Sequence, residues 1–126
     1  MNLVMAYTLS QDANRQEGWT TSVHCSYYAV FQYMKYLLAE KADLPISYSS
    51  QDDNTGEDSH KYILQEIKNR IPNITAARNI GNRIKDLRQK RVLADYKNYI
   101  FSQDDSLDCF SEADAIIRNL KTLFRA

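Results

Sequence analysis

The sequence predicts an all-α fold, an antiparallel up-and-down bundle of about five helices that forms one domain over residues 1–126. Three observations predict this fold. The 126 residues include only 3 glycines and 2 prolines, too few turn residues for the many hairpins of a β protein. Apolar residues recur at steps of three and four along most of the chain. Hydrophobic residues make up 44% of the sequence and charged residues 25%, which excludes a wholly disordered chain.

The first two expected helices cover residues 2–16 and about 21–41. A modest apolar pattern marks the first, and Gly18 is expected to end it. Thr20, Thr21 and Ser22 offer an N-cap for the second helix, which has the strongest apolar spacing in the chain. Because this helix is apolar nearly all round, we expect it to be central or covered by a second subunit. Its buried face is expected to include Val23, Tyr27, Val30, Met34, Leu37 and Leu38.

The second half of the chain predicts a long acidic loop followed by three helices. The loop covers residues 42–57, and Thr55 with Asp58 resembles a capping box for a helix at about 58–71. Pro72 separates that helix from a fourth at about 75–101. The polar residues 102–106 form a short turn with N-cap residues, and a last helix follows at about 106–125.

The charges are balanced overall but segregated along the chain. Sixteen Lys and Arg residues against sixteen Asp and Glu residues give a net charge of zero, which argues against a general polyanion binder. Residues 78–97 nevertheless hold seven basic and two acidic side chains, whereas residues 40–58 hold six acidic and one basic. The neutral total therefore hides an asymmetry between these two segments.

Arg91 breaks the apolar pattern of this fourth helix. On a helical wheel of ~100° per residue it falls at about 20° from Ile80, in the middle of the apolar stripe. A charge there needs a partner or a solvent-filled cleft, since burying a lone ion costs several kcal/mol. Asp95, four residues on, can pair with it. Alternatively, Arg91 lines a cleft and binds an anion such as a nucleotide phosphate, for which its planar donors are well suited.

A second basic feature is a row of cations seven residues apart. Arg83, Lys90 and Lys97 lie beside the apolar stripe along roughly 21 Å of helix. This row is either a solvated helix face or a phosphate track for RNA.

The remaining reactive residues show no recognised catalytic or metal-binding motif. His24 and His60 are the only histidines, each with polar neighbours, and either can act as a general base or serve as a structural residue. Cys25 and Cys109 are expected to be buried free thiols. We expect no metal and no cofactor, since the sequence lacks a zinc cluster and a Gly-rich phosphate loop. Without a signal peptide or an apolar run of about 18 residues, a cytoplasmic protein is expected.

Three segments, taken in order, resemble one known family. Residues 22–31 (SVHCSYYAVF) look like the YYAxF second helix of HEPN domains (higher eukaryotes and prokaryotes nucleotide-binding). Residues 58–62 (DSHKY) resemble the His-containing segment that opens their third helix, and residues 87–96 (LRQKRVLADY) are similar to a late R-x3-DY segment. The resemblance covers nearly the whole chain, about residues 3–124.

The resemblance implies an all-α bundle that commonly dimerises, in a toxin–antitoxin, phage-defence or RNA-processing context. Many HEPN domains are metal-independent RNases with an Arg-x4–6-His motif on the late helix. That helix has no histidine here: Asp95, Tyr96 and Lys97 stand four to six residues after Arg91. We therefore expect a binding module rather than an enzyme, because no near-neutral base is available on this helix.

The resemblance thus predicts a dimeric HEPN module that binds a nucleotide, RNA or a protein partner. Its cleft is expected to be lined by Arg91, Asp95, Tyr96, Tyr27, Tyr28 and His60. Two alternatives remain open. In one, the protein is an RNase in which Arg91 works with a histidine from another helix or subunit. In the other, it is the structural partner of a separately encoded minimal nucleotidyltransferase.

Overall fold

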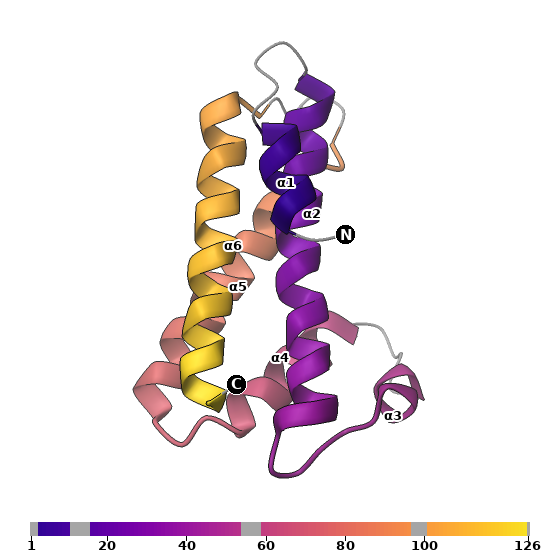
Figure 1. Ribbon diagram of the computed structural model, residues 1–126, viewed down its shortest axis with the longest axis vertical. Helices are drawn as coiled ribbons and strands as arrows, with labels where there is room; N and C mark the ends of the chain where they lie inside the picture. Colours follow the sequence, from indigo (N-terminus) through magenta and orange to yellow (C-terminus); the bar gives the residue numbers. More distant parts are fainter. Residues whose placement is uncertain (1–2, 11–15, 54–58, 97–100, 126) are drawn as a thin grey trace.

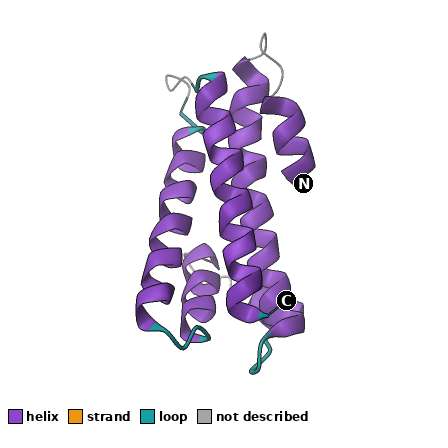
Figure 2. Ribbon diagram, turned by 60° about the vertical axis from the view of Figure 1, so that its left-hand side comes forward, coloured by secondary structure: helices purple, strands orange, loops and turns teal. Residues whose placement is uncertain are grey.

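The computed structural model describes residues 3–10, 16–53, 59–96 and 101–125, and every regular element in these ranges is a helix (Figures 1 and 2). The all-α fold predicted from the sequence is confirmed. None of the described helices is both long and apolar enough to cross a membrane. In chain order the elements are α1 (Leu3–Ser10), α2 (Gln16–Tyr36), the π-helix η1 (Leu37–Lys41), α3 (Tyr48–Asp53), α4 (Ser59–Asn69), α5 (Ile74–Leu93) and α6 (Gln103–Phe124).

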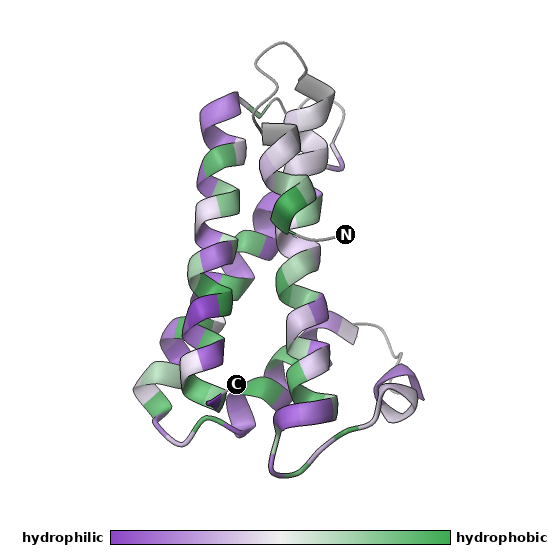
Figure 3. Cartoon of the chain, in the orientation of Figure 1, coloured by the Kyte–Doolittle hydropathy of each residue, from purple (hydrophilic) through white to green (hydrophobic). Residues whose placement is uncertain are grey.

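Helix α2 is the centre of the bundle. It packs against α1, α4, α5 and α6, whereas α1 reaches only α2 and α6 among its main neighbours. In Figure 1, α6 runs beside α1 and α2 along the long axis, and α4 and α5 lie behind them. The hydropathy colouring of Figure 3 shows α6 banded in green and purple, as expected for a helix with one buried and one exposed face.

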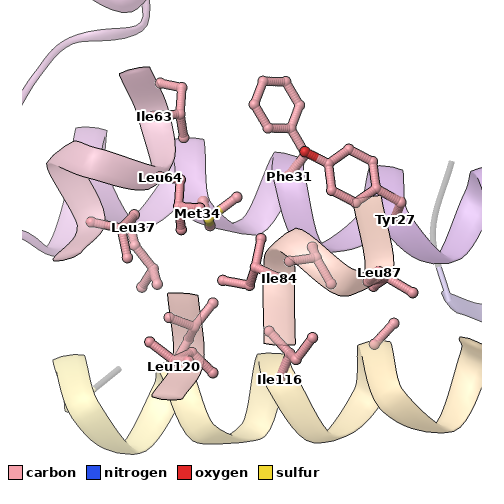
Figure 4. Packing of buried hydrophobic residues seen from close by; sticks show 14 of the residues in the cluster. Tyr27, Phe31, Met34, Leu37, Ile63, Leu64, Ile84, Leu87, Ile116 and Leu120 are labelled. Carbon is pink, nitrogen blue, oxygen red and sulfur yellow. The ribbon is translucent and has the colours of Figure 1, made fainter. Parts of the chain in front are cut away.

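The core forms where α2, α4, α5 and α6 meet (Figure 4). Each helix contributes apolar side chains at helical spacing, and burying a large one stabilises the fold by roughly 1.5–3 kcal/mol. Close to the centre lie Tyr27 and Phe31 of α2, Ile63 and Leu64 of α4, Ile84 and Leu87 of α5, and Ile116 and Leu120 of α6.

The boundary expected between the first two helices was wrong. Helix α2 begins at Gln16, so Gly18 lies buried in its first turn instead of ending the preceding helix. Ser22, expected near an N-cap, lies inside α2 and donates its hydroxyl proton to the carbonyl oxygen of Ala6 at 2.6 Å. The hydroxyl therefore ties α1 to α2 instead of capping α2.

The acidic segment contains a short helix that the sequence pattern did not predict. In α3 the buried Gln51 donates from Nε2 to the carbonyl oxygens of Lys35, at 3.0 Å, and Ile46, at 2.9 Å. A six-residue helix anchored by one amide has no apolar periodicity to detect. The capping box expected at Thr55 and Asp58 lies outside the described residues.

Helix α5 ends earlier than expected, at Leu93 instead of about residue 101. The Ala94 N–H bonds to the carbonyl oxygens of Lys90 and Val92, which tightens the last turn, and Phe101 is buried outside any helix. The N-cap expected in residues 102–106 is confirmed: Ser102 and Asp105 form a reciprocal capping box at the start of α6.

Candidate functional site

A groove of about 430 Å3 opens between α4 and α5, with α2 at its base. Its lining falls into two chemical groups. The apolar group consists of Tyr27, Leu64, Ile84 and Val92, and the polar group consists of His60, Lys61, Lys85, Arg88 and Gln89.

Helical periodicity places these residues on facing stripes. The α5 members lie at positions 84, 85, 88, 89 and 92, and the α4 members at 60, 61 and 64, so each set shares one side of its helix. Ile84 and Leu64 are buried in the core. Lys85, next to Ile84, and Lys61, three residues before Leu64, are exposed. The groove therefore has an apolar base and a cationic rim.

The described lining of the groove is rich in cations. Lys61, Lys85 and Arg88 supply three cations, and no carboxylate is among the described residues that line the groove. A concave surface lined by one sign of charge concentrates ions of the opposite sign. Arg88 offers planar, bidentate donors for a phosphate or carboxylate, and the two lysines offer compact point charges.

His60 is held in a fixed orientation at the start of α4. Its Nδ1 lies 2.8 Å from the hydroxyl oxygen of Tyr27, and its ring stacks on Phe31 with the ring centres 4.2 Å apart. Tyr27 is only 1% exposed, so its hydroxyl is fixed in turn. Either the phenol donates to Nδ1 or an Nδ1–H donates to the phenol oxygen, according to the tautomer of the imidazole.

The arrangement has two chemical capabilities. Cations around an apolar base can hold an anionic ligand that has a flat or apolar body. His60 adds an imidazole, a side chain that often acts as a general base or acid, and it lines the same groove as the guanidinium of Arg88. Among the described residues, no group of three His, Cys, Asp or Glu side chains is placed to hold a metal ion.

The predicted pair of Arg91 and Asp95 is not formed, and this expectation was wrong. Among the described residues the partner of Asp95 is His24, with Nε2 and Oδ1 3.4 Å apart. Helix α5 ends at Leu93, so Asp95 leaves the helix and loses the i,i+4 geometry that the pairing required. Arg91 is half-buried, and its Nε atom is buried without a hydrogen-bond partner in the described structure.

The structure divides the residues expected to share one cleft. Tyr27 and His60 lie in the groove, whereas Arg91, Asp95 and Tyr96 are outside its lining. Tyr96 follows the end of α5 and is 62% exposed. Tyr28 is 41% exposed and meets only the edge of Phe31, with ring centres 6.3 Å apart.

Sequence reasoning missed Lys61, Lys85 and Arg88 as site residues. The signal was partly present, because Lys85 and Arg88 belong to the basic segment 78–97 and Lys61 follows His60. Their convergence depends on α4 and α5 packing side by side, and helical spacing within one segment does not reveal that packing.

The predicted phosphate track lies on the other side of α5, where it is balanced by acids. Arg83 donates from Nε to Oε1 of Glu112 at 2.7 Å, and this hydrogen bond raises the pKa of Arg83. Lys90 lines the same hollow, whose acidic members are Asp86, Asp108 and Glu112. Lys97 lies outside the described residues. Carboxylates that match or outnumber the cations oppose a phosphate on this side.

The model of the HEPN domain matches residues 8–123, nearly the whole chain. The chain belongs to the HEPN domain family. The resemblance inferred from the three segments is thus confirmed, and the matched range includes the whole α4–α5 groove. The late helix of this HEPN domain, α5, contains no histidine, so the only imidazole in its groove is that of His60 from α4.

The two other comparisons add nothing to this assignment: no curated protein and no solved structure matches the chain.

Proposed function

We propose that this HEPN domain is a non-catalytic binding module that holds a nucleotide or RNA in the α4–α5 groove. One observation carries the proposal: three cations surround an apolar base, and no carboxylate is among the described lining residues. The volume of the groove falls within the ~300–1,000 Å3 of ordinary small-molecule sites. A nucleotide suits a groove with an apolar base and a cationic rim, because the nucleobase is flat and largely apolar and the phosphate is anionic.

Each part of a nucleotide has a counterpart in the groove. Lys85 and Arg88 stand one helical turn apart on α5, and Lys61 faces them from α4, so a phosphate can be contacted from both helices. Hydrogen bonds to charged groups contribute about 1.5–3 kcal/mol each. Tyr27, Ile84 and Val92 offer apolar surface to a base, and the amide of Gln89 offers a donor and an acceptor to its edge.

Binding of a fluorescein-labelled uridine monophosphate, followed by fluorescence anisotropy, tests the proposal. We expect Lys85→Gln and Arg88→Gln each to weaken binding about tenfold, because each removes one charge-assisted contact. Lys121→Gln is the matched control, since Lys121 is an exposed cation on α6 away from the groove. Equal, small effects of all three variants would contradict the proposal.

A second candidate function is metal-independent RNA cleavage. The specific observation in its favour is that His60 shares the groove with Arg88, so a base and a guanidinium come from different helices. This arrangement revises the alternative in which Arg91 was the arginine. Incubation of RNA in EDTA with the wild-type protein and with His60→Gln distinguishes the binding module from the RNase. A binding module leaves the RNA intact. Cleavage by the wild type that is lost in His60→Gln supports the RNase.

We also propose that the protein is a homodimer through the outer face of α1 and α2. The described residues that line a shallow groove there are all uncharged: Leu3, Val4, Ala29, Gln32, Tyr33, Tyr36 and Ile117. Val4 is 73% exposed, and Tyr36 adds an exposed ring from the central helix. Exposed apolar and aromatic surface of this kind is typical of subunit interfaces. Light scattering that gives a monomer mass at tens of micromolar protein would contradict this proposal.

A protein partner, such as a separately encoded minimal nucleotidyltransferase, would compete with the second copy for this same face. Adding a candidate partner to the purified protein during size-exclusion chromatography tests this alternative: a heterodimer that replaces the homodimer supports it, and unchanged elution rejects it.

A further inference from the structure

A second cavity, of about 530 Å3, lies at the end of the bundle where η1, α4 and α6 end. Its described lining comes from residues 41–44, from residues 69, 70 and 72, and from residues 123–125. Figure 1 shows the last turn of α6 at the lower end of the bundle, together with the turns that follow η1 and α4. The cavity shares no described lining residue with the α4–α5 groove.

The lining of this cavity has a large apolar part. Leu123 and Phe124 are half-buried residues that pack against the core, and Leu44 and Pro72 come from the two other segments. Leu44 is 74% exposed, and Ile74, two residues after Pro72, is 75% exposed. Exposed apolar side chains that gather at a cavity are typical of an interaction site, so this cavity can bury an apolar side chain of a ligand.

The loop after η1, which carries Leu44, is held in place by Arg70. Atoms Nε and Nη2 of Arg70 donate to the carbonyl oxygen of Leu44, at 3.0 and 2.5 Å, and Nη1 donates to Oε2 of Glu66 at 2.7 Å. The N–H of Ile46 bonds to the carbonyl oxygen of Leu38 at 2.9 Å. Because the loop is ordered without a ligand, binding there has a smaller entropic cost.

Two further cations line the cavity. Lys41 and Arg125 are exposed, and within the described part of the chain neither side chain forms a hydrogen bond or an ion pair. Asp43 is the one acid in the described lining. The backbone is unusual at both cations, since Lys41 ends a π-helix and Arg125 has a φ of 54° in the left-handed region. Both conformations are rare outside glycine-containing turns and are enriched at functional sites.

The helix ends also supply hydrogen-bond acceptors to this cavity. The last four carbonyl groups of a helix lack an intrahelical partner, and they give the helix C-terminus a partial negative charge. Such carbonyl groups accept from the N–H groups of a peptide, whereas they repel the phosphates of a nucleic acid. Apolar surface, cations and acceptors together are complementary to a peptide that carries apolar side chains and carboxylates.

We infer that this cavity is a docking site for a short segment of a partner protein in which apolar side chains stand between carboxylates. The apolar side chains enter the cavity, the carboxylates pair with Lys41 and Arg125, and the backbone N–H groups of the segment donate to the helix-end carbonyl groups. The inference does not depend on the function of the α4–α5 groove, because the two sites have separate linings.

Three fluorescein-labelled hexapeptides with blocked ends test the chemistry of the occupant. They are Gly-Asp-Leu-Phe-Glu-Gly, its amide counterpart Gly-Asn-Leu-Phe-Gln-Gly and the polar Gly-Asp-Ser-Ser-Glu-Gly. Fluorescence anisotropy measures their binding to the whole chain. We expect the first peptide to bind about tenfold more tightly than either of the others, because only the first combines carboxylates with an apolar anchor.

Matched variants locate the site. Lys41→Gln with Arg125→Gln should bring the acidic and amide peptides within about twofold of each other. Leu44→Ser should weaken the acidic peptide about fivefold and leave thermal unfolding unchanged, because Leu44 is exposed. Lys85→Gln with Lys90→Gln removes the same charge from exposed positions of α5 and should keep the tenfold preference. Uridine monophosphate should not displace the acidic peptide.

Four results would overturn the inference. The first is no binding of the acidic peptide at millimolar concentration, and the second is equal binding of the acidic and amide peptides. The third is an equal loss in the two double variants. The fourth is displacement of the acidic peptide by an equal concentration of uridine monophosphate, which would place the peptide in the α4–α5 groove.

Discussion

The two flanks of α5 carry similar cations but differ in what the neighbouring helix brings to them. On the flank that faces α6, Arg83 and Lys90 meet Asp108 and Glu112. On the flank that faces α4, Lys85 and Arg88 meet Lys61 instead. On the α6 flank Arg83 forms an ion pair with Glu112, whereas the described lining of the α4 flank brings three cations together. The difference indicates that the neighbouring helix, more than the charge count of the segment, sets the local charge balance around each cation.

Charge reversal on the two flanks should give the largest contrast. Lys85 and Lys90 are both exposed lysines of α5, one on each flank. We expect Lys85→Glu to weaken binding of a uridine oligonucleotide about 50-fold, because it puts a carboxylate into the groove. Lys90→Glu should weaken it less than threefold.

Fluorescence anisotropy at one fixed salt concentration measures both variants. Comparable losses in the two would show that the oligonucleotide responds to the net charge of α5 and not to one flank, and the comparison of the flanks would fail.

Helix α6 also contains a buried thiol, Cys109, whose titration should affect the stability of the protein. Burial raises the pKa of Cys109 to about 11; Lys90 opposes this, and Asp105, Asp108 and Glu112 raise the pKa further. The folded state therefore keeps its proton at a pH where the unfolded thiol, with a pKa near 9, has lost it. The free energy of unfolding is therefore highest below pH 9. It falls by up to ~1–2 kcal/mol as the pH rises from 9 to 11.

Urea unfolding of the wild type and Cys109→Ala at pH 8 and pH 10.5 measures this loss. The stability of the wild type should fall further between the two pH values than that of Cys109→Ala. Parallel losses in the two proteins would contradict the assignment of the pH dependence to this thiol.

On the α4 flank, Tyr27→Phe should have a moderate effect on stability and a larger relative effect on binding. The change removes the hydroxyl that lies 2.8 Å from Nδ1 of His60, at a cost of about 0.5–1.5 kcal/mol in the free energy of unfolding. The released imidazole should then bind nucleotide several-fold more weakly, because it is no longer pre-oriented. Thermal unfolding with and without uridine monophosphate measures both effects, and Tyr33→Phe on the α1 side of α2 serves as the control.

The smallest effect is expected for Gly81→Ala, where α5 packs against α4. Alanine favours a helix over glycine by about 1 kcal/mol, but the new Cβ would lie 3.1 Å from Cδ of Lys68. Because the contact is with a flexible side chain, Lys68 can shift, and the net stabilisation should be a few tenths of a kcal/mol. Chemical denaturation measures it, and clear destabilisation would show that the Lys68 stem is held rigidly across α5.

Features of the fold that depend on local sequence periodicity could be predicted, whereas features that depend on contacts between separate segments could not. Helix identity follows from local periodicity, and so the central α2 and the N-cap at Ser102 were predicted. The short α3 was not predicted, because it is stabilised by hydrogen bonds from the Gln51 side chain to the carbonyl groups of Lys35 and Ile46, and not by an apolar pattern. The end of α5 was misjudged: the helix ends at Leu93, whereas the apolar stripe still includes Ala94.

The candidate site was only partly predictable for the same reason. Tyr27 and His60 were identified from segments that resemble the HEPN family, and the structure brings them within hydrogen-bond distance. Arg91 was favoured because it interrupts an apolar stripe, a local signal. Lys61, Lys85 and Arg88 interrupt nothing in their own helices, and their common location arises only from the packing of α4 against α5.

The most direct test of the central claim, that the α4–α5 groove is the anion-binding site, is a titration of the 15N-labelled protein with a uridine hexanucleotide, followed by NMR chemical shifts. The account predicts that the largest shifts fall on His60, Lys61, Lys85, Arg88 and Gln89, with the α6 flank around Asp108 and Glu112 unaffected. Shifts concentrated on the α6 flank or on α1, or no shifts at millimolar ligand, would contradict it.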